Sequence, residues 1–176
     1  MTKIEWLGRS ILERIDGIAH FRTAYAHCDI PCGIYDPHQA QVAAHTVIRM
    51  VQLINDLKVP TMEAKPEERQ AFVSKMQRYI AVKEQHAELC KSEIRILWGD
   101  YFKPDHTKDN PQLHDLIWKT LKSASKARQE IGMDAAKDLL NNVEQVAEMF
   151  WKTKGINTKR VKSFYPTNEE IVYPQI

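Results

Sequence analysis

Apolar residues recur along most of the chain at the three-to-four-residue spacing of an α-helix. The four stripes run through residues 47–57, 72–97, 113–124 and 139–151, and proline or glycine lies between them. No segment alternates apolar and polar residues over a useful length, so we expect no strand. Four amphipathic helices with short connections predict an all-α fold, an antiparallel up-and-down four-helix bundle.

Helix-starting residues stand where the stripes begin. Asp36 followed by Pro37 offers a capping side chain and then a proline at the first helical position, and Pro66 opens the second stripe in the same way. Residues 37–154 are therefore predicted to form the bundle domain. The tail, residues 155–176, has no sustained period and no predicted structure.

Composition narrows the class of protein. The chain has 176 residues, enough for one domain with a real core. Its net charge of +2 is too small to indicate nucleic acid, and it has no apolar run long enough to span a membrane. Three cysteines are too few, and odd in number, for a disulfide scaffold, so we expect a reducing, cytoplasmic location.

The first 26 residues form a predicted leader. Charged side chains interrupt their helical pattern, so the leader lacks the apolar core of a secretion signal. Ala24 and Ala26 nevertheless place small residues at the two positions that enzymes of the signal-peptidase type read. We expect a processing peptidase to remove residues 1–26 and to leave His27 as the first residue.

The sequence that follows, HCDIPCGIYDP, concentrates possible metal donors around Cys28 and Cys32. It is neither a C-x-x-C motif nor half of a zinc finger, because no second pair of donors follows at the required spacing. By spacing alone the cysteines could be buried small residues, an occasional disulfide or a weak zinc site with a distant ligand. These alternatives stay open if the chain is not cut.

Cleavage before His27 changes the donor set. The new α-amine, the Cys28 amide nitrogen and the thiolates of Cys28 and Cys32 would form a plane of two nitrogens and two sulfurs. Such a plane suits Ni(II) or Cu(II) better than zinc, and the His27 imidazole lies close enough to bind axially. Thiolate and amide donors also stabilise a higher oxidation state, so nickel could cycle between Ni(II) and Ni(III).

The same residues closely resemble the nickel-binding hook of nickel superoxide dismutases, H-C-D-x-P-C-G-x-Y-D-P. The stretches VKEQHAEL, LWGDYFKP, PQLH and FWKTK are also similar to that family, so the resemblance covers most of residues 27–154. It implies a four-helix bundle, a homohexamer, and a precursor whose leader is removed. It also implies conversion of superoxide to dioxygen and hydrogen peroxide by Ni(III)/Ni(II) cycling, with one nickel ion per subunit.

Carried over to this sequence, the resemblance gives a ligand set within the hook, defined here as residues 27–36. The ligands would be His27 through its amine and imidazole, Cys28 through its amide and thiolate, and Cys32 through its thiolate.

The resemblance also implies residues around the metal. The residues expected to act in catalysis are Asp29, Tyr35, Tyr101 and Lys103. Tyr35 would narrow access to the metal and orient small anions or water, and Lys103 would attract superoxide by its charge. An ion pair that orients the axial histidine in some members is absent here. We expect His86 to contribute a hydrogen bond in its place.

Two further candidates are expected to be structural. His45 and Cys90 lie in helix stripes, where a satisfied, partly buried histidine and a core thiol are the common cases.

Two other classes of function remain as alternatives. One is a nickel or copper binding or delivery protein that uses the same chelate without turnover. The other is a structural helical bundle in which the cysteines are incidental.

Overall fold

The computed structural model describes residue 11, residues 14–15 and residues 33–176. The chain divides into two compact units, residues 1–32 and residues 33–176. In the first unit, Ile11, Arg14 and Ile15 are helical and exposed. The second unit contains the long helices and both strands of the described part of the chain.

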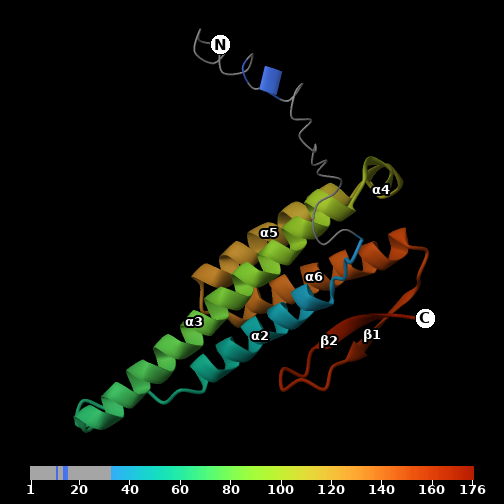
Figure 1. The fold of residues 1–176 in the computed structure, drawn as a ribbon. Coiled ribbons are helices and arrows are strands. Elements are labelled where there is room, and N and C mark those ends of the chain that lie inside the picture. The colour runs from blue at the N-terminus through green and yellow to red at the C-terminus, as the bar shows by residue number, and fades with distance from the viewer. Residues whose placement is uncertain (1–10, 12–13, 16–32) are drawn as a thin grey trace. The chain divides into compact units, whose positions relative to one another are not determined.

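Four long helices of the second unit form a bundle (Figure 1). They are α2 (His38–Asn55), α3 (Pro66–Ile96), α5 (Leu113–Gln129) and α6 (Met133–Thr153). Helix α2 packs against α3, α3 against α5, α5 against α6, and α6 against α2. Each long helix therefore neighbours the next along the chain, and the predicted four-helix bundle is confirmed.

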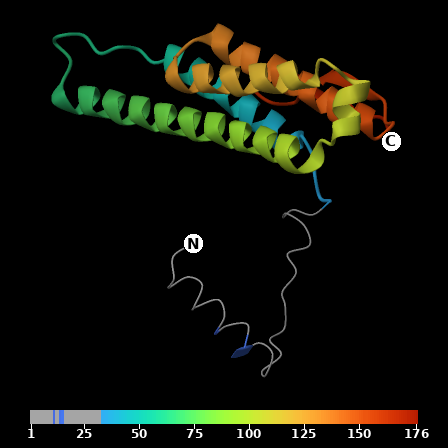
Figure 2. The same cartoon turned by 90° about the horizontal axis from the view of Figure 1, so that it is seen from above.

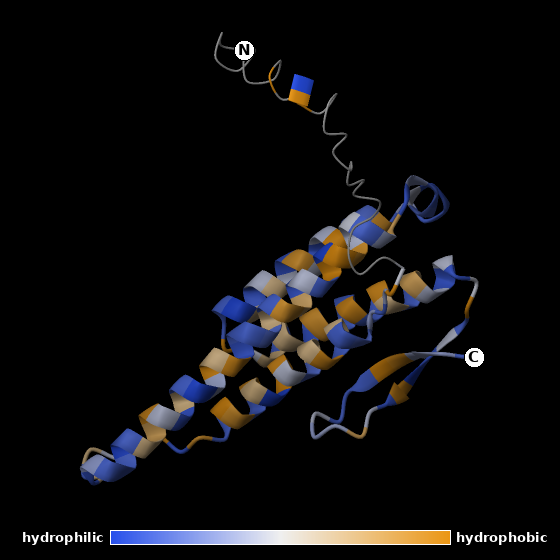
Figure 3. Cartoon of the chain, viewed as in Figure 1, coloured by the Kyte–Doolittle hydropathy of each residue, from blue (hydrophilic) through white to orange (hydrophobic). Residues whose placement is uncertain are grey.

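The apolar stripes meet in one core. Figure 3 shows the apolar segments gathered where the helices face one another. Val47, Ile94, Leu139 and Phe150 are each fully buried there. Cys90 is also fully buried in this cluster, which confirms its expected structural role. None of the helices in the described ranges is long and apolar enough to cross a membrane.

Helix α3 continues past the other helices at its N-terminal end (Figures 1 and 2). Its start at Pro66 is the predicted one, with Glu67 and Glu68 in the first turn, where the helix dipole favours negative charge. Further along, Lys83 is buried against the end of α5. Its ammonium group donates hydrogen bonds of 2.7–2.8 Å to the carbonyls of Ala127, Arg128 and Glu130. A lysine from one helix thus caps the C-terminus of another.

The C-terminal tail forms an antiparallel β-hairpin of β1 (Thr158–Lys162) and β2 (Glu170–Pro174). The expectation that no segment forms a strand is wrong here. The two consecutive residues Ile171 and Val172 are both buried, so β2 does not show the alternation on which the expectation depended. The hairpin is fixed by contacts with the bundle.

Two polar side chains of α2 form hydrogen bonds with backbone groups on the edge of β2 that does not pair with β1. The Gln41 side-chain amide donates to the Val172 carbonyl (3.1 Å) and accepts from the Val172 N–H (2.8 Å). His45 Nε2 donates to the Glu170 carbonyl (2.9 Å), because a carbonyl can only accept. Neutral His45 Nδ1 then accepts from the Thr167 hydroxyl at 2.9 Å. His45 is therefore a buried, satisfied histidine, as expected, and its burial lowers its pKa below 6.5.

An ion-pair cluster joins β1 to α6. Arg160 donates to Glu148 at 2.7 and 3.1 Å and to Glu144 at 2.7 Å. Glu144 is almost fully buried, and desolvation raises its pKa from the ordinary 4.5 to about 7 in spite of Arg160. Between pH 4.5 and 7 the folded chain therefore binds more protons at Glu144 than the unfolded chain does.

Glu144 should make stability fall as pH rises through this window, by at most about 1.4 kcal/mol per pH unit. His45 acts in the opposite direction, since its pKa is lowered, so the Glu144 effect must be isolated. We expect Glu144→Gln to remove the falling component. Urea unfolding of wild type and variant at pH 5, 6, 7 and 8 measures this. A difference between the two chains that does not change with pH would contradict the prediction.

Candidate metal centre

The described part of the predicted site begins at the entry to α2. Gly33 has φ +89°, a left-handed conformation that glycine adopts without steric cost, and the chain turns there towards Tyr35. The Asp36 carboxylate then accepts from the His38 N–H at 2.7 Å and starts the helix. Tyr35 is thereby held immediately before α2, against the core.

The second half of the described site lies at the end of α3, where η1 (Leu97–Tyr101) widens the last turn into a π-helix. The Phe102 N–H donates to the Leu97 carbonyl at 2.9 Å, which closes this wide turn. Such turns are rare and frequently occur at functional sites. The short helix α4 (Pro104–Asp109) follows and leads into α5.

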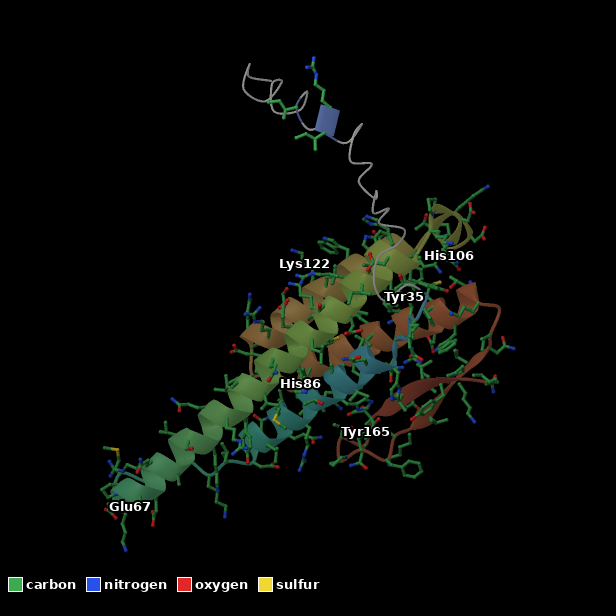
Figure 4. All side chains as sticks on the ribbon, in the orientation of Figure 1. Tyr35, Glu67, His86, His106, Lys122 and Tyr165 are labelled. Carbon is green, nitrogen blue, oxygen red and sulfur yellow. The ribbon has the colours of Figure 1, made fainter. Side chains whose placement is uncertain are left out.

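The structure brings Tyr35 and Tyr101 together. Their ring centroids lie 5.6 Å apart, with the planes tilted by 55°. Tyr101 also packs on Phe150 of α6, with the centroids 4.5 Å apart, and on His106 of α4, 5.6 Å away. Figure 4 shows Tyr35 and His106 at the same end of the bundle. Both tyrosines predicted from the sequence are therefore parts of one aromatic cluster.

Polar groups at the C-terminal end of α6 and just after it fix Tyr101 in this cluster. Its hydroxyl lies 2.7 Å from the hydroxyl of Thr153. The ammonium of Lys154 lies 5.5 Å from the Tyr101 ring centroid and 5.0 Å from that of Phe150, which is cation–π distance. The sequence indicated FWKTK as part of the resemblance but gave no role to Thr153 or Lys154. Their helical spacing from Phe150, three and four residues, was the available signal.

Lys103 and His86 are less closely tied to the tyrosine pair. Lys103 is exposed at the start of α4, and its backbone N–H donates to His106 Nδ1 at 3.2 Å. His86 lies in α3, fifteen residues before Tyr101, which corresponds to roughly 22 Å along a helix. Its Nδ1 donates to the Val82 carbonyl at 2.9 Å. The role of His86 towards His27 stays a prediction.

The predicted ligands His27, Cys28 and Cys32 and the predicted catalytic residue Asp29 lie outside the described residues. Within the ranges that the structure describes, no three His, Cys, Asp or Glu side chains form a group that could hold a metal ion. The described thiol, Cys90, is buried, and burial raises its pKa to about 12. It is therefore a neutral core group, and the role of Cys28 and Cys32 as thiolate donors stays a prediction.

A four-helix bundle with an aromatic cluster at one end and a sequence that predicts thiolate ligands are together consistent with a redox metalloprotein, and comparison with known proteins shows its family. A family model described as nickel-containing superoxide dismutase matches residues 22–154. The chain is 36% identical over 132 residues to the nickel superoxide dismutase of Streptomyces coelicolor, covering 75% of this chain and 91% of that protein. The corresponding enzyme of Streptomyces seoulensis is 34% identical, with 73% and 88% covered.

Solved structures give the same result. A native nickel superoxide dismutase structure is similar with a TM-score of 0.62 at 35% identity, covering 73% of this chain and 99% of that one. A structure of the oxidised nickel-ligated form has a TM-score of 0.63 at 32% identity, with the same coverage. This chain belongs to the nickel-containing superoxide dismutase family. The β-hairpin lies beyond the matched residues.

Proposed function

We propose that this chain dismutates superoxide at a nickel centre held by His27, Cys28 and Cys32 after residues 1–26 have been removed. Two superoxide ions and two protons give one dioxygen and one hydrogen peroxide. The observation that carries the location of the site is the packing of Tyr35 against Tyr101. Cys32 precedes Tyr35 by three residues, a span of at most about 11 Å, which supports a metal centre at this end of the bundle.

The donor chemistry of the hook fits nickel. The amine and imidazole of His27, the amide nitrogen and thiolate of Cys28 and the thiolate of Cys32 would hold the ion, and such nitrogen and thiolate donors suit nickel better than zinc. When bound there, nickel would supply one-electron redox chemistry between its divalent and trivalent states.

The described residues would control what reaches this centre. Tyr35 and Tyr101, whose rings pack together, would narrow the approach to the metal and exclude larger molecules. Lys103, which is exposed, and Lys154, which lies over the Tyr101 ring, add positive charge near the entrance. Positive potential at a narrow entrance raises the encounter rate with a small anion such as superoxide. Asp29, next to the ligand Cys28, is proposed to take part at the same site.

Assembly, maturation and location follow from the resemblance and the sequence. We propose a homohexamer, a peptidase that cuts between Ala26 and His27, and a cytoplasmic location, which the few cysteines of the sequence support.

Sequencing the N-terminus of protein purified from its native host, with nickel quantified in the same sample, tests the proposal. We expect a chain that begins at His27 and carries one nickel ion per subunit. A chain that begins at Met1 and holds no stoichiometric nickel would overturn it.

A further inference from the structure

The hydroxyl pair of Tyr101 and Thr153 has a defined direction. Thr153 Oγ1 lies 2.7 Å from the Tyr101 hydroxyl and also 2.7 Å from the Phe150 carbonyl. A carbonyl can only accept, so the Thr153 hydroxyl donates its one hydrogen to the Phe150 carbonyl. The Tyr101 hydroxyl must then be the donor to Thr153. The single phenolic proton therefore points towards α6. The Tyr101 oxygen can accept further hydrogen bonds but has no proton left to donate.

The surroundings hold Tyr101 in this orientation. Its ring lies between Phe150 and Phe102, with centroids at 4.5 and 5.2 Å, while His106 packs at 5.6 Å with its plane tilted by 30°. Tyr35 contacts the same ring. Rotation of the ring would break several of these contacts at once, so the ring is held in place. Only the O–H bond can turn, and its direction depends on the available hydrogen-bond acceptor.

We propose that Thr153 is a positioning residue that keeps Tyr101 a hydrogen-bond acceptor at the metal centre, an inference that rests on the proposed function. A molecule that forms a hydrogen bond with the Tyr101 oxygen must therefore be the donor. Water and hydrogen peroxide have one to donate, whereas the superoxide anion does not. Tyr101 thus binds water or product and gives no hydrogen bond to anions, which keeps small anions from being retained beside the hook.

Removal of the Thr153 hydroxyl should release the phenolic proton. In Thr153→Val the side chain keeps its shape but offers no acceptor, so Tyr101 becomes free to donate to an anion. We expect azide to bind roughly fivefold more tightly to the mature nickel-loaded variant, the factor that corresponds to one net hydrogen bond. Thr153→Ser, which keeps the hydroxyl, should bind azide like wild type.

The control is Thr120→Val. Thr120 is a buried threonine of α5 whose hydroxyl donates to the Leu116 carbonyl at 2.7 Å, the same kind of bond within a helix. Loss of the Thr120 hydroxyl should lower the stability of the fold without a change in azide affinity. Thr153→Ala replaces Thr153→Val if the valine variant does not fold.

A second measurement needs no nickel. The uncleaved chain is labelled with ¹³C at the tyrosine ζ carbons, and the Tyr101 resonance is identified by its loss in Tyr101→Phe. We expect this resonance to shift in Thr153→Val and to stay in place in Thr153→Ser and Thr120→Val. An unshifted resonance, or a shifted resonance with unchanged azide affinity, would overturn the positioning role. Wild-type protein that binds no nickel would instead contradict the proposed function. The resonance measurement would still test whether Thr153 orients the Tyr101 hydroxyl.

Discussion

Replacement of Cys28 or Cys32 by serine is expected to reduce nickel in the mature protein to background and superoxide dismutation to the uncatalysed rate. The physical reason is the donor set. A thiolate gives electron density to the metal, whereas a serine hydroxyl is neutral at neutral pH and a poor donor for a soft or borderline ion. The helical bundle should stay folded, because its core lies within residues 33–176. Metal analysis, pulse-generated superoxide decay and circular dichroism measure the three quantities.

Cys90→Ser is the matched control, since the chain has only three cysteines. Its thiol is fully buried, and its pKa is raised to about 12 by desolvation. The serine hydroxyl would enter an apolar core and cost on the order of 1–3 kcal/mol of stability, with nickel content unchanged. A hook variant that keeps nickel and activity, or one that loses its helices, would contradict separate roles for hook and core.

The helices could be predicted because burial repeats along them. Val47, Ile94 and Leu139 are core residues at positions that the 3.6-residue period assigns to the inner face. Lys83 and Gln41 could not be predicted, since a period assigns polar residues to solvent. Both are buried because their polar atoms find backbone partners, the carbonyls at the end of α5 for Lys83 and the edge of β2 for Gln41. Partners so distant in sequence leave no local pattern.

The same limit explains the hairpin. Each strand has five residues, too few for a reliable period, and β2 buries two neighbours instead of alternating. Its stability depends on contacts with α6, which precedes it, and with α2, which lies more than a hundred residues away in the sequence. Tertiary contact therefore decides the structure of the tail where local preference does not.

The residues of the candidate site could be predicted where they belong to a sequence motif. Their arrangement in space could not be predicted, because it depends on the fold. The residue types around Cys28 and Cys32 indicate metal chemistry by themselves, and the resemblance implied Tyr35 and Tyr101. That these two rings pack together is a property of the fold. The direction of the Tyr101 proton depends on Thr153 and the Phe150 carbonyl, a hydroxyl relay that no residue pattern reveals.

Blocking removal of the leader is expected to leave a folded chain without dismutase activity. Ala26→Glu puts a charged side chain at the position immediately before the predicted cut, where small residues are read. His27 then keeps its nitrogen in a peptide bond. A peptide nitrogen shares its lone pair with the carbonyl and binds a metal only after it loses its proton, as the Cys28 amide would do once the α-amine has anchored the ion. Without a free amine at His27 the donor set loses that anchor. We expect activity at the uncatalysed rate, with the helical circular dichroism signal retained.

Thr23→Glu is the control, because it adds the same charge to the leader outside the two small-residue positions, Ala24 and Ala26. It should be cut normally and be fully active. A chain synthesised to begin directly at His27 should recover nickel binding and activity without any peptidase, which separates the need for the amine from the need for the enzyme that exposes it. N-terminal sequencing of each sample gives the state of the leader. Full activity in a chain that still begins at Met1 would show that the His27 amine is not a required ligand.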